Sequence, residues 1–106
     1  SGAGLILHSR DLPLLPGARA LADQGSFSGG MGRNRQYLEE VFGRLRVDPA
    51  VPEALVKLLC ESETSGGLFF AVDPALAAAI HEAFARAKEP VWEIGEVTTQ
   101  PGLALI

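Results

Sequence analysis

Short apolar runs alternate along the chain with apolar residues at helical spacing, and the two patterns predict different elements. The stretches with the pattern of strands are 5–7, 45–48, 68–72, 91–97 and 103–106. The stretches with helical spacing are 16–24, 34–43, 52–60 and 73–89. Because residues 68–72 are apolar without interruption, they are predicted to form a central strand covered on both faces. The resulting order of elements predicts an α+β domain, built as an α/β sandwich, over residues 1–106.

Residues at the predicted helix ends support these boundaries. Pro16 suits a first helical position, and Gly25 suits the position just past a helix end. Asn34 is predicted to be the N-cap of the second helix, and Asp73 the N-cap of the last one. The chain between the first two helices therefore has to be a connection.

That connection, residues 25–33, is rich in glycine and serine, a composition that favours a turn over a regular element. A surface loop is predicted, and a loop that approaches a phosphate or a partner domain is the alternative. Arg33 and Arg35 could pair with phosphate or with the glutamates at 39 and 40, and the sequence favours a solvated face.

Composition and charge exclude several classes of partner. The chain has 106 residues, of which 47% are apolar, so it can bury a core of ordinary size. A net charge of −4 and a pI near 5.0 leave no basic footprint, so nucleic acid is not expected as a partner. No apolar run approaches the roughly 20 residues that a membrane-spanning helix needs, so no membrane partner is expected.

Residue types that often carry catalysis or metal binding are sparse. The single cysteine, Cys60, continues a helical apolar stripe and is predicted to be a core residue; one cysteine also fits a reducing cytoplasm. His8 and His81 have no second ligand at metal spacing, and Lys57 and Lys88 lie on predicted helices. No catalytic and no metal-binding residue is therefore assigned to this chain.

The strongest candidate for ligand binding is the turn before residues 68–72. Thr64 and Ser65 offer hydroxyls, while Gly66 and Gly67 can adopt positive φ and let a ligand reach backbone N–H groups. Successive N–H groups in such a turn can form an anion site, and a phosphate is the natural guest. A purely structural connection is the alternative, and it is favoured by these four residues alone because no lysine follows the glycines.

Three stretches together resemble one family, the selenophosphate synthetases (selenide, water dikinases). Residues 64–68, Thr-Ser-Gly-Gly-Leu, resemble the end of its Asp-Pro-Gln-Thr-Ser-Gly-Gly-Leu-Leu motif. Residues 14–18, Leu-Leu-Pro-Gly-Ala, resemble its Pro-Leu-Leu-Pro-Gly-Ala, and residues 28–34 resemble its Pro-Gly-Gly-Thr-x-x-Asn turn. The order and spacing of the stretches also fit, so the resemblance covers nearly the whole chain.

The resemblance implies the C-terminal lobe of an enzyme that makes selenophosphate, AMP and phosphate from selenide, ATP and water. The fold would be the α/β sandwich of aminoimidazole ribonucleotide synthetase-like proteins, with Thr64, Ser65, Gly66 and Gly67 close to the nucleotide. ATP and magnesium would bind the complete enzyme, whose N-terminal ATP-binding lobe is the implied partner in a cytoplasmic homodimer. This chain would be an excised lobe that lacks its first strand and helix, binds no cofactor by itself and is inactive alone.

The chain also departs from the family motif. Cys60, Glu61, Ser62 and Glu63 stand where the family usually has Phe, Asp, Pro and Gln, and Glu63 adds a negative charge beside a predicted phosphate site. Two alternatives therefore remain open. One is a non-catalytic interaction or scaffold domain with the same fold; the other is the equivalent lobe of a related ATP-dependent synthetase or kinase.

Overall fold

The computed structural model describes residues 2–42, 45–63 and 65–106. Its strands are β1 (Gly4–Leu7), β2 (Leu45–Val47), β3 (Gly95–Thr98) and β4 (Gly102–Leu105). Its helices are α1 (Ala18–Asp23), α2 (Met31–Phe42), α3 (Glu53–Leu59), the 3-10 turn η1 (Pro74–Leu76) and α4 (Ala77–Ala87). This mixture confirms the predicted α+β fold class.

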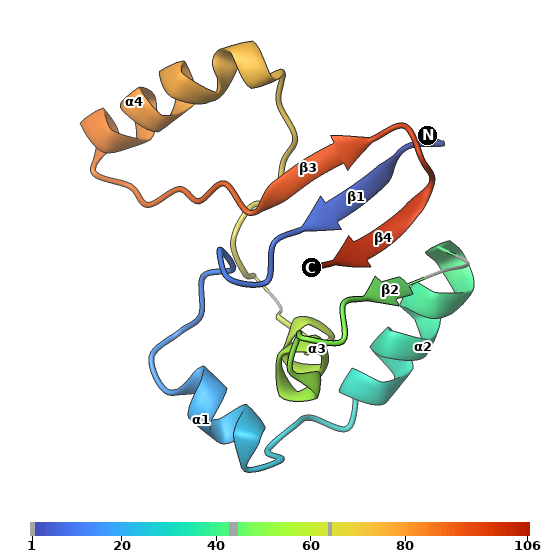
Figure 1. The fold of residues 1–106 in the computed structure, drawn as a ribbon. Coiled ribbons are helices and arrows are strands. Elements are labelled where there is room, and N and C mark those ends of the chain that lie inside the picture. Colours follow the sequence, from blue (N-terminus) through green and yellow to red (C-terminus); the bar gives the residue numbers. More distant parts are fainter. Residues whose placement is uncertain (1, 43–44, 64) are drawn as a thin grey trace.

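The strands form one mixed sheet in the order β2-β4-β1-β3. β1 and β2 both run parallel to β4, whereas β3 runs antiparallel to β1. β2 therefore lies at one edge of the sheet. Figure 1 shows α1, α2 and α3 gathered on the β2 side of the molecule, while α4 stands apart on the β3 side.

Two glycines allow the antiparallel pair to form. A Cβ on Gly95 would overlap the carbonyl oxygen of Ile6, and a Cβ on Gly4 would overlap the carbonyl oxygen of Gln100. Both positions therefore exclude any side chain, because the neighbouring atoms belong to backbone that cannot move aside. The closeness of β1 to its neighbours depends on these two residues.

The buried core lies between α3 and the parallel strands. Val51, Leu55, Val56 and Leu105 form the buried cluster, and partly buried apolar residues of β1 and β2 pack against it. Cys60 is 3% exposed, which confirms that it is a core residue. Within α3, Val56 is 2% exposed and faces the core, whereas Leu59 is 39% exposed.

The prediction of a central strand at residues 68–72 is wrong. These residues form no strand and are exposed, with Leu68 at 88%. An apolar run becomes a buried strand only where a neighbouring strand can pair with it, and none of the described residues pairs with this run. The only ring contact recorded for it within the described part of the chain is the stacking of Phe70 on Phe84 of α4, with centroids 6.3 Å apart.

The last predicted helix is confirmed, but its packing is loose. Asp73 caps it as expected, since its Oδ1 accepts a hydrogen bond of 2.9 Å from the N–H of Ala75. No residue of α4 is buried, so the apolar stripe of this helix faces no closed core. The strand predicted at 91–97 is also shorter than expected and begins only at Gly95.

The second helix begins earlier than predicted. Met31 is its first residue, so Asn34 lies in the first turn and is not the N-cap. The side chain of Asn34 instead donates hydrogen bonds to residues beyond α3. Gly43, the predicted end of this helix, lies outside the described residues. The first helix is confirmed in a shorter form, with Gly17 at its N-cap and Gly25 just past its end.

Candidate functional site

The glycine-rich turn before α2 meets the segment that follows α3. The N–H of Ser28 donates to Oε1 of Glu61 at 2.7 Å. Asn34 donates from Nδ2 to the carbonyl oxygen of Cys60 at 2.9 Å and to Oγ of Ser62 at 3.2 Å. These bonds join residues 26 to 33 positions apart in the sequence. The structure thus brings residues 28–34, which carry part of the family resemblance, into direct contact with residues 60–62, which closely precede another resembling stretch.

Close approach at this junction depends on a glycine. A Cβ on Gly30 would lie 3.0 Å from Oγ of Ser62 and 3.6 Å from Oγ of Ser28. A distance of 3.0 Å is tighter than most Cβ contacts, so a larger residue would require the Ser62 hydroxyl, to which Asn34 donates a hydrogen bond, to shift by a few tenths of an ångström. The N–H of Gly30 donates to Oγ of Ser28 at 3.3 Å, which helps to close the turn itself.

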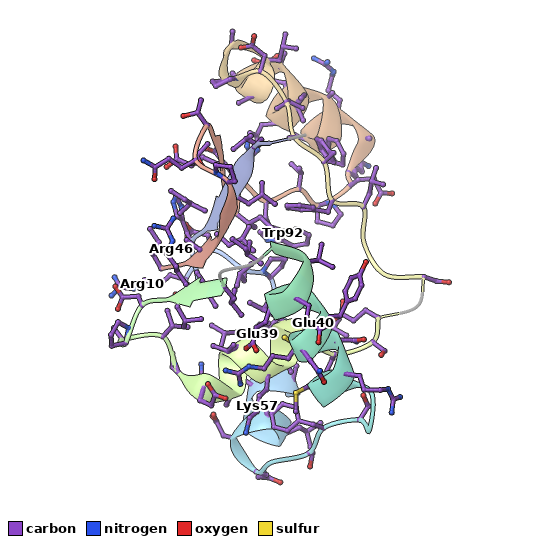
Figure 2. The ribbon with its side chains drawn as sticks, turned by 90° about the vertical axis from the view of Figure 1, so that its right-hand side faces the viewer. Arg10, Glu39, Glu40, Arg46, Lys57 and Trp92 are labelled. Atoms are coloured by element: carbon purple, nitrogen blue, oxygen red, sulfur yellow. The ribbon has the colours of Figure 1, made fainter. Side chains whose placement is uncertain are left out.

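The same turn is also held on α3 by an aromatic contact. The ammonium group of Lys57 lies 5.7 Å from the centre of the Phe27 ring, within the range of a cation–π interaction. α2 and α3 lie side by side, with Glu39 and Glu40 projecting from α2 and Lys57 from α3 (Figure 2). The glycine turn is therefore fixed to α3 through several different side chains.

The predicted ligand-binding turn follows directly after this junction. Thr64 lies outside the described residues. The N–H of Gly66 donates to the carbonyl oxygen of Glu63 at 3.2 Å, so residues 63–66 close a tight turn. Residues 65–67 are all exposed, and Gly67 has open space where a Cβ would be. Both glycines therefore remain accessible to a ligand.

The expected source of positive φ in this turn is wrong. Ser65 has φ of 62°, whereas neither Gly66 nor Gly67 is among the residues with positive φ. A left-handed conformation at a residue with a Cβ costs roughly 1–2 kcal/mol. In the turn closed by the bond from Gly66 to Glu63, Ser65 is the third residue, the position that has positive φ in a type II turn and is usually glycine or asparagine.

Charged groups around the junction have shifted protonation equilibria. Hydrogen bonds from the Ser28 hydroxyl and backbone hold the pKa of Glu61 below its ordinary value. Burial raises the pKa of the Cys60 thiol, so this cysteine is not an activated nucleophile. A hydrogen bond to Glu53 raises the pKa of Arg35.

The two arginines of the turn behave differently. Arg35 forms ion pairs with Glu53 and, at 3.3 Å, with Glu39, so it is a structural cation of the α2 surface. This agrees with the predicted solvated face, although Glu53 replaces Glu40 as one of the partners. Arg33 is exposed and has no ion-pair partner among the residues that the structure describes.

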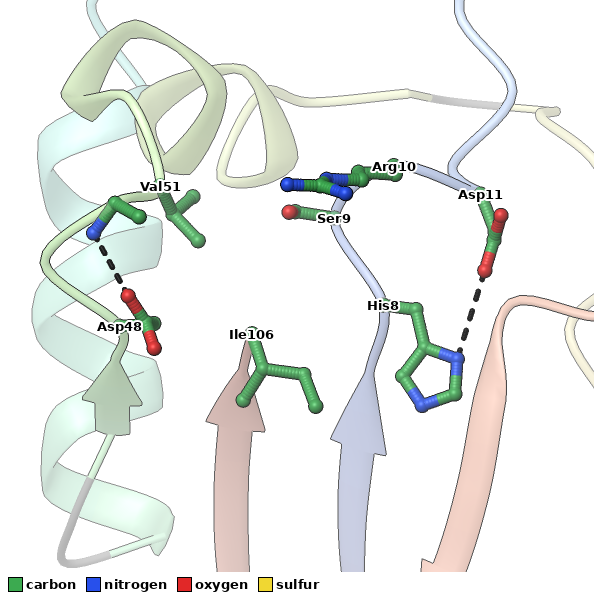
Figure 3. Close-up of a pocket in the computed structure, with 8 residues that line it drawn as sticks. His8, Ser9, Arg10, Asp11, Asp48, Val51 and Ile106 are labelled. Atoms are coloured by element: carbon green, nitrogen blue, oxygen red, sulfur yellow. Dashed lines mark hydrogen bonds and ion pairs between the residues drawn. The ribbon is translucent and has the colours of Figure 1, made fainter.

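A hollow of about 380 Å³ lies at the carboxyl ends of β1 and β4 (Figure 3). His8 and Asp11 form an ion pair of 3.5 Å there, and the Arg10 guanidinium extends over Ser9. Oδ1 of Asp48 accepts a hydrogen bond of 2.8 Å from the N–H of Ala50. The lining mixes both signs of charge and contains none of the predicted site residues, so it does not select a class of ligand.

A larger apolar groove of about 800 Å³ lies on the β3 side of the molecule. Residues 67–72, α4 and residues 89–97 line it, together with Leu5 and Leu7 of β1. Trp92, labelled in Figure 2, is 55% exposed there. Residues 68–72 are exposed because they line this open groove.

Metal binding and membrane insertion find no support in the part of the chain that the structure describes. No group of three or more histidine, cysteine, aspartate or glutamate residues comes together there as metal ligands would. No helix of the described ranges is long and apolar enough to cross a bilayer. The described residues therefore do not fit a magnesium ion.

Sequence reasoning named the ligand-binding turn but missed the residues that join it to the glycine turn. Asn34 lies in a stretch that carries the resemblance and Glu61 stands three positions before another, and that was the available signal. Helix-capping rules assigned Asn34 to a local role, because they do not consider acceptors distant in the sequence. The long-range bonds of Asn34 and Glu61 could only be found in the folded chain.

Comparison with known proteins gives matches over most of the chain. The family model described as AIR synthase related protein, C-terminal domain, matches residues 38–106. The chain is 38% identical over 103 residues to the selenide, water dikinase of Cronobacter sakazakii, which covers 95% of this chain and 28% of that protein. It is 33% identical over 97 residues to the selenide, water dikinase of Nitratidesulfovibrio vulgaris, covering 92% of this chain and 27% of that protein. The chain thus spans little more than a quarter of the length of these relatives.

Proposed function

The chain belongs to the AIR synthase related protein family, in its C-terminal domain, and from this premise we propose that it acts as the C-terminal domain of a selenide, water dikinase. Similarity to proteins of that name over nearly the whole chain supports the proposal. The complete enzyme would convert selenide, ATP and water into selenophosphate, AMP and phosphate. The present chain has a single cysteine, Cys60, which is buried and free, and this suits a cytoplasmic protein.

The observation that carries the proposal is the contact between residues 28–34 and 60–63. Residues 28–34 resemble one motif of the family and residues 60–63 directly precede another, Thr-Ser-Gly-Gly-Leu, and the hydrogen bonds of Ser28 and Asn34 bring the two segments together in the folded chain. A shared site explains this arrangement more directly than two unrelated turns do. We therefore assign the nucleotide phosphates to the turn of Thr64, Ser65, Gly66 and Gly67, which follows this junction and of which residues 65–67 are exposed.

Two observations support a partner region that this sequence does not include. The relatives are about four times as long as the matched segment. The groove beside β3 leaves apolar residues exposed, and exposed apolar surface of this extent marks an interaction site. We propose that an N-terminal ATP-binding region supplies the carboxylates for magnesium and the catalytic groups, and that the complete enzyme is a homodimer.

Within this division of roles, the present chain contributes binding and enclosure. The N–H of Gly66 is already bonded to Glu63, so the backbone N–H groups of Ser65 and Gly67 would orient the phosphates, and closure over the nucleotide would exclude water. Magnesium, when bound by the complete enzyme, would neutralise phosphate charge. Glu63 lies beside this turn, so its carboxylate would weaken the attraction for phosphate unless it points to solvent.

A domain exchange tests the proposal directly. The matched segment of the Cronobacter sakazakii enzyme is replaced by this chain, and AMP formation that depends on selenide is measured. The parent enzyme and the parent without the segment are the controls. We expect the exchanged enzyme to regain activity that the truncated one lacks. A folded exchanged enzyme without selenide-dependent AMP formation would instead favour a scaffold domain.

The isolated chain gives a second test. Calorimetry with magnesium and ATP should detect no tight binding, and a phosphate-release assay should detect no turnover, because the metal ligands and catalytic groups are assigned elsewhere. Tight binding or turnover by the 106 residues alone would contradict this division of roles.

A further inference from the structure

We propose that Asn34 and Glu61 are positioning residues, which fix the glycine turn at 28–30 against the end of α3 and thereby orient the turn at 64–67. The contacts of the two side chains carry this inference. It rests on the proposed function only where turnover is concerned. Neither residue is assigned any contact with substrate.

Asn34 holds the chain at the point where it leaves α3. Its Nδ2 donates to the carbonyl oxygen of Cys60 and to Oγ of Ser62, on either side of residue 61. The carbonyl of Cys60 can only accept, so the amide nitrogen, not the amide oxygen, must face it. Two bonds from one amide to residues 60 and 62 restrict the direction of the chain that leads to residues 65–67.

Glu61 holds the opposite side of the junction. Its Oε1 accepts the N–H of Ser28 at 2.7 Å, a distance typical of a charge-assisted hydrogen bond. The backbone of the glycine turn is thus tied to residue 61, while Asn34 ties the first turn of α2 to residues 60 and 62. The Glu61 side chain reaches from the second segment to the first, and the Asn34 side chain reaches from the first to the second. Neither segment can therefore slide past the other while the bonds of both side chains persist.

The end of α3 is a rigid support for this arrangement. Cys60 is 3% exposed and Val56 2% exposed, so the helix is anchored in the core up to its last turn. The turn at 64–67 begins only two residues after Ser62. A change in the hold on residues 60–62 therefore reaches the turn through very few bonds.

The test compares Asn34→Asp, Glu61→Ala and Glu61→Gln in the 106-residue chain. Asn34→Asp keeps the shape of the side chain but removes the amide donor. Glu61→Gln keeps an acceptor for Ser28, whereas Glu61→Ala removes it. Gln36→Glu is the matched control for Asn34→Asp, because Gln36 is exposed on α2 and its side chain bonds to Glu40 of the same helix, away from residues 60–62.

Amide hydrogen exchange and NMR chemical shifts are the readouts. Glu61→Ala should speed exchange of the Ser28 amide about tenfold, the ratio expected when one hydrogen bond to a charged group is lost. Asn34→Asp and Glu61→Ala should shift the amide signals of residues 65–67. Glu61→Gln should leave the Ser28 exchange rate and the signals of residues 65–67 close to those of the unchanged chain. Gln36→Glu should alter neither.

Unchanged signals at residues 65–67 in both Asn34→Asp and Glu61→Ala would overturn the proposal, because the junction would then be a local contact without influence on the turn. If the variant at Asn34 or at Glu61 does not fold, the variant at the other residue decides the test. In the domain-exchanged enzyme, the same variants should raise KM for ATP or lower kcat with little loss of thermal stability. An inactive exchanged parent would refute the proposed function and leave the NMR result to decide the positioning role.

Discussion

Replacing Gly66 by valine tests whether the turn at residues 64–67 binds a ligand or serves only as a structural connection. A Cβ on Gly66 would lie 3.2 Å from the carbonyl oxygen of Glu63 and 3.4 Å from the Cβ of the same residue. Glu63 is exposed and can move by the few tenths of an ångström needed, and Gly66 does not require positive φ. The free energy of unfolding should therefore fall by only about 1 kcal/mol, near the centre of the values measured for single substitutions.

That cost predicts a small effect on thermal stability. For a domain of this size, about 1 kcal/mol corresponds to a fall in Tm of roughly 4–8 °C. Turnover of the domain-exchanged enzyme should fall much further, by at least about tenfold, or roughly 1.4 kcal/mol of transition-state stabilisation. The valine methyl groups would cover the backbone N–H groups that are proposed to face the phosphates.

Thermal unfolding and selenide-dependent AMP formation are measured on the same preparations. Gly66→Ala gives the intermediate case, with a smaller side chain at the same place. Ala79→Val, on the exposed surface of α4, controls for adding the same bulk far from the turn. If Gly66→Val unfolds the protein, or leaves turnover intact, the turn is structural and the reasoning is refuted.

Further predictions follow from the helix ends, the core and the junction. Lys88 has φ of 58° at the C-cap of α4, so Lys88→Gly should raise the free energy of unfolding by about 1 kcal/mol in urea titrations. Val56→Ala, at a buried core position, should lower it by about 2 kcal/mol in the same assay, and no loss would contradict the assigned core. The pKa of Glu61 lies below its ordinary value of 4.5, so its contribution to stability is present above pH 4.5 and lost only as the pH falls through the lowered pKa. NMR signals of the Ser28 amide should therefore change below pH 4.5, and a change centred at or above it would contradict the bond.

The elements of this fold were largely predictable because their signals are local. Helical spacing gave α1, α3 and α4, and Asp73 was read correctly as a cap. The start of α2 was missed because Asn34 satisfies the rule for an N-cap and yet donates its amide to Cys60 and Ser62. Competing acceptors distant in the sequence are invisible to a rule based on neighbouring residues.

The error at residues 68–72 has a different cause. An uninterrupted apolar sequence indicates that a segment should be buried, but it does not indicate which strand, if any, pairs with that segment. In the described structure the run lies along an open groove and pairs with no strand. The candidate turn was likewise identified from its residue types. Its backbone conformation was not predicted, since the residue with positive φ is Ser65 and not a glycine. The junction that supports the turn depends on tertiary contacts and could not be predicted from local patterns.

The order of strands in the sheet also has a consequence for folding during synthesis. β1, near the start of the chain, pairs with β3 and β4, so Gly4 lies opposite Thr98 and Leu5 opposite Leu103. The centre of the sheet cannot form until nearly all of the 106 residues have left the ribosome. At roughly 5–20 residues per second, β1 waits on the order of 5–20 s for its partners. During that time its apolar residues are available to chaperones, and such long-range pairing makes slow folding the expected behaviour.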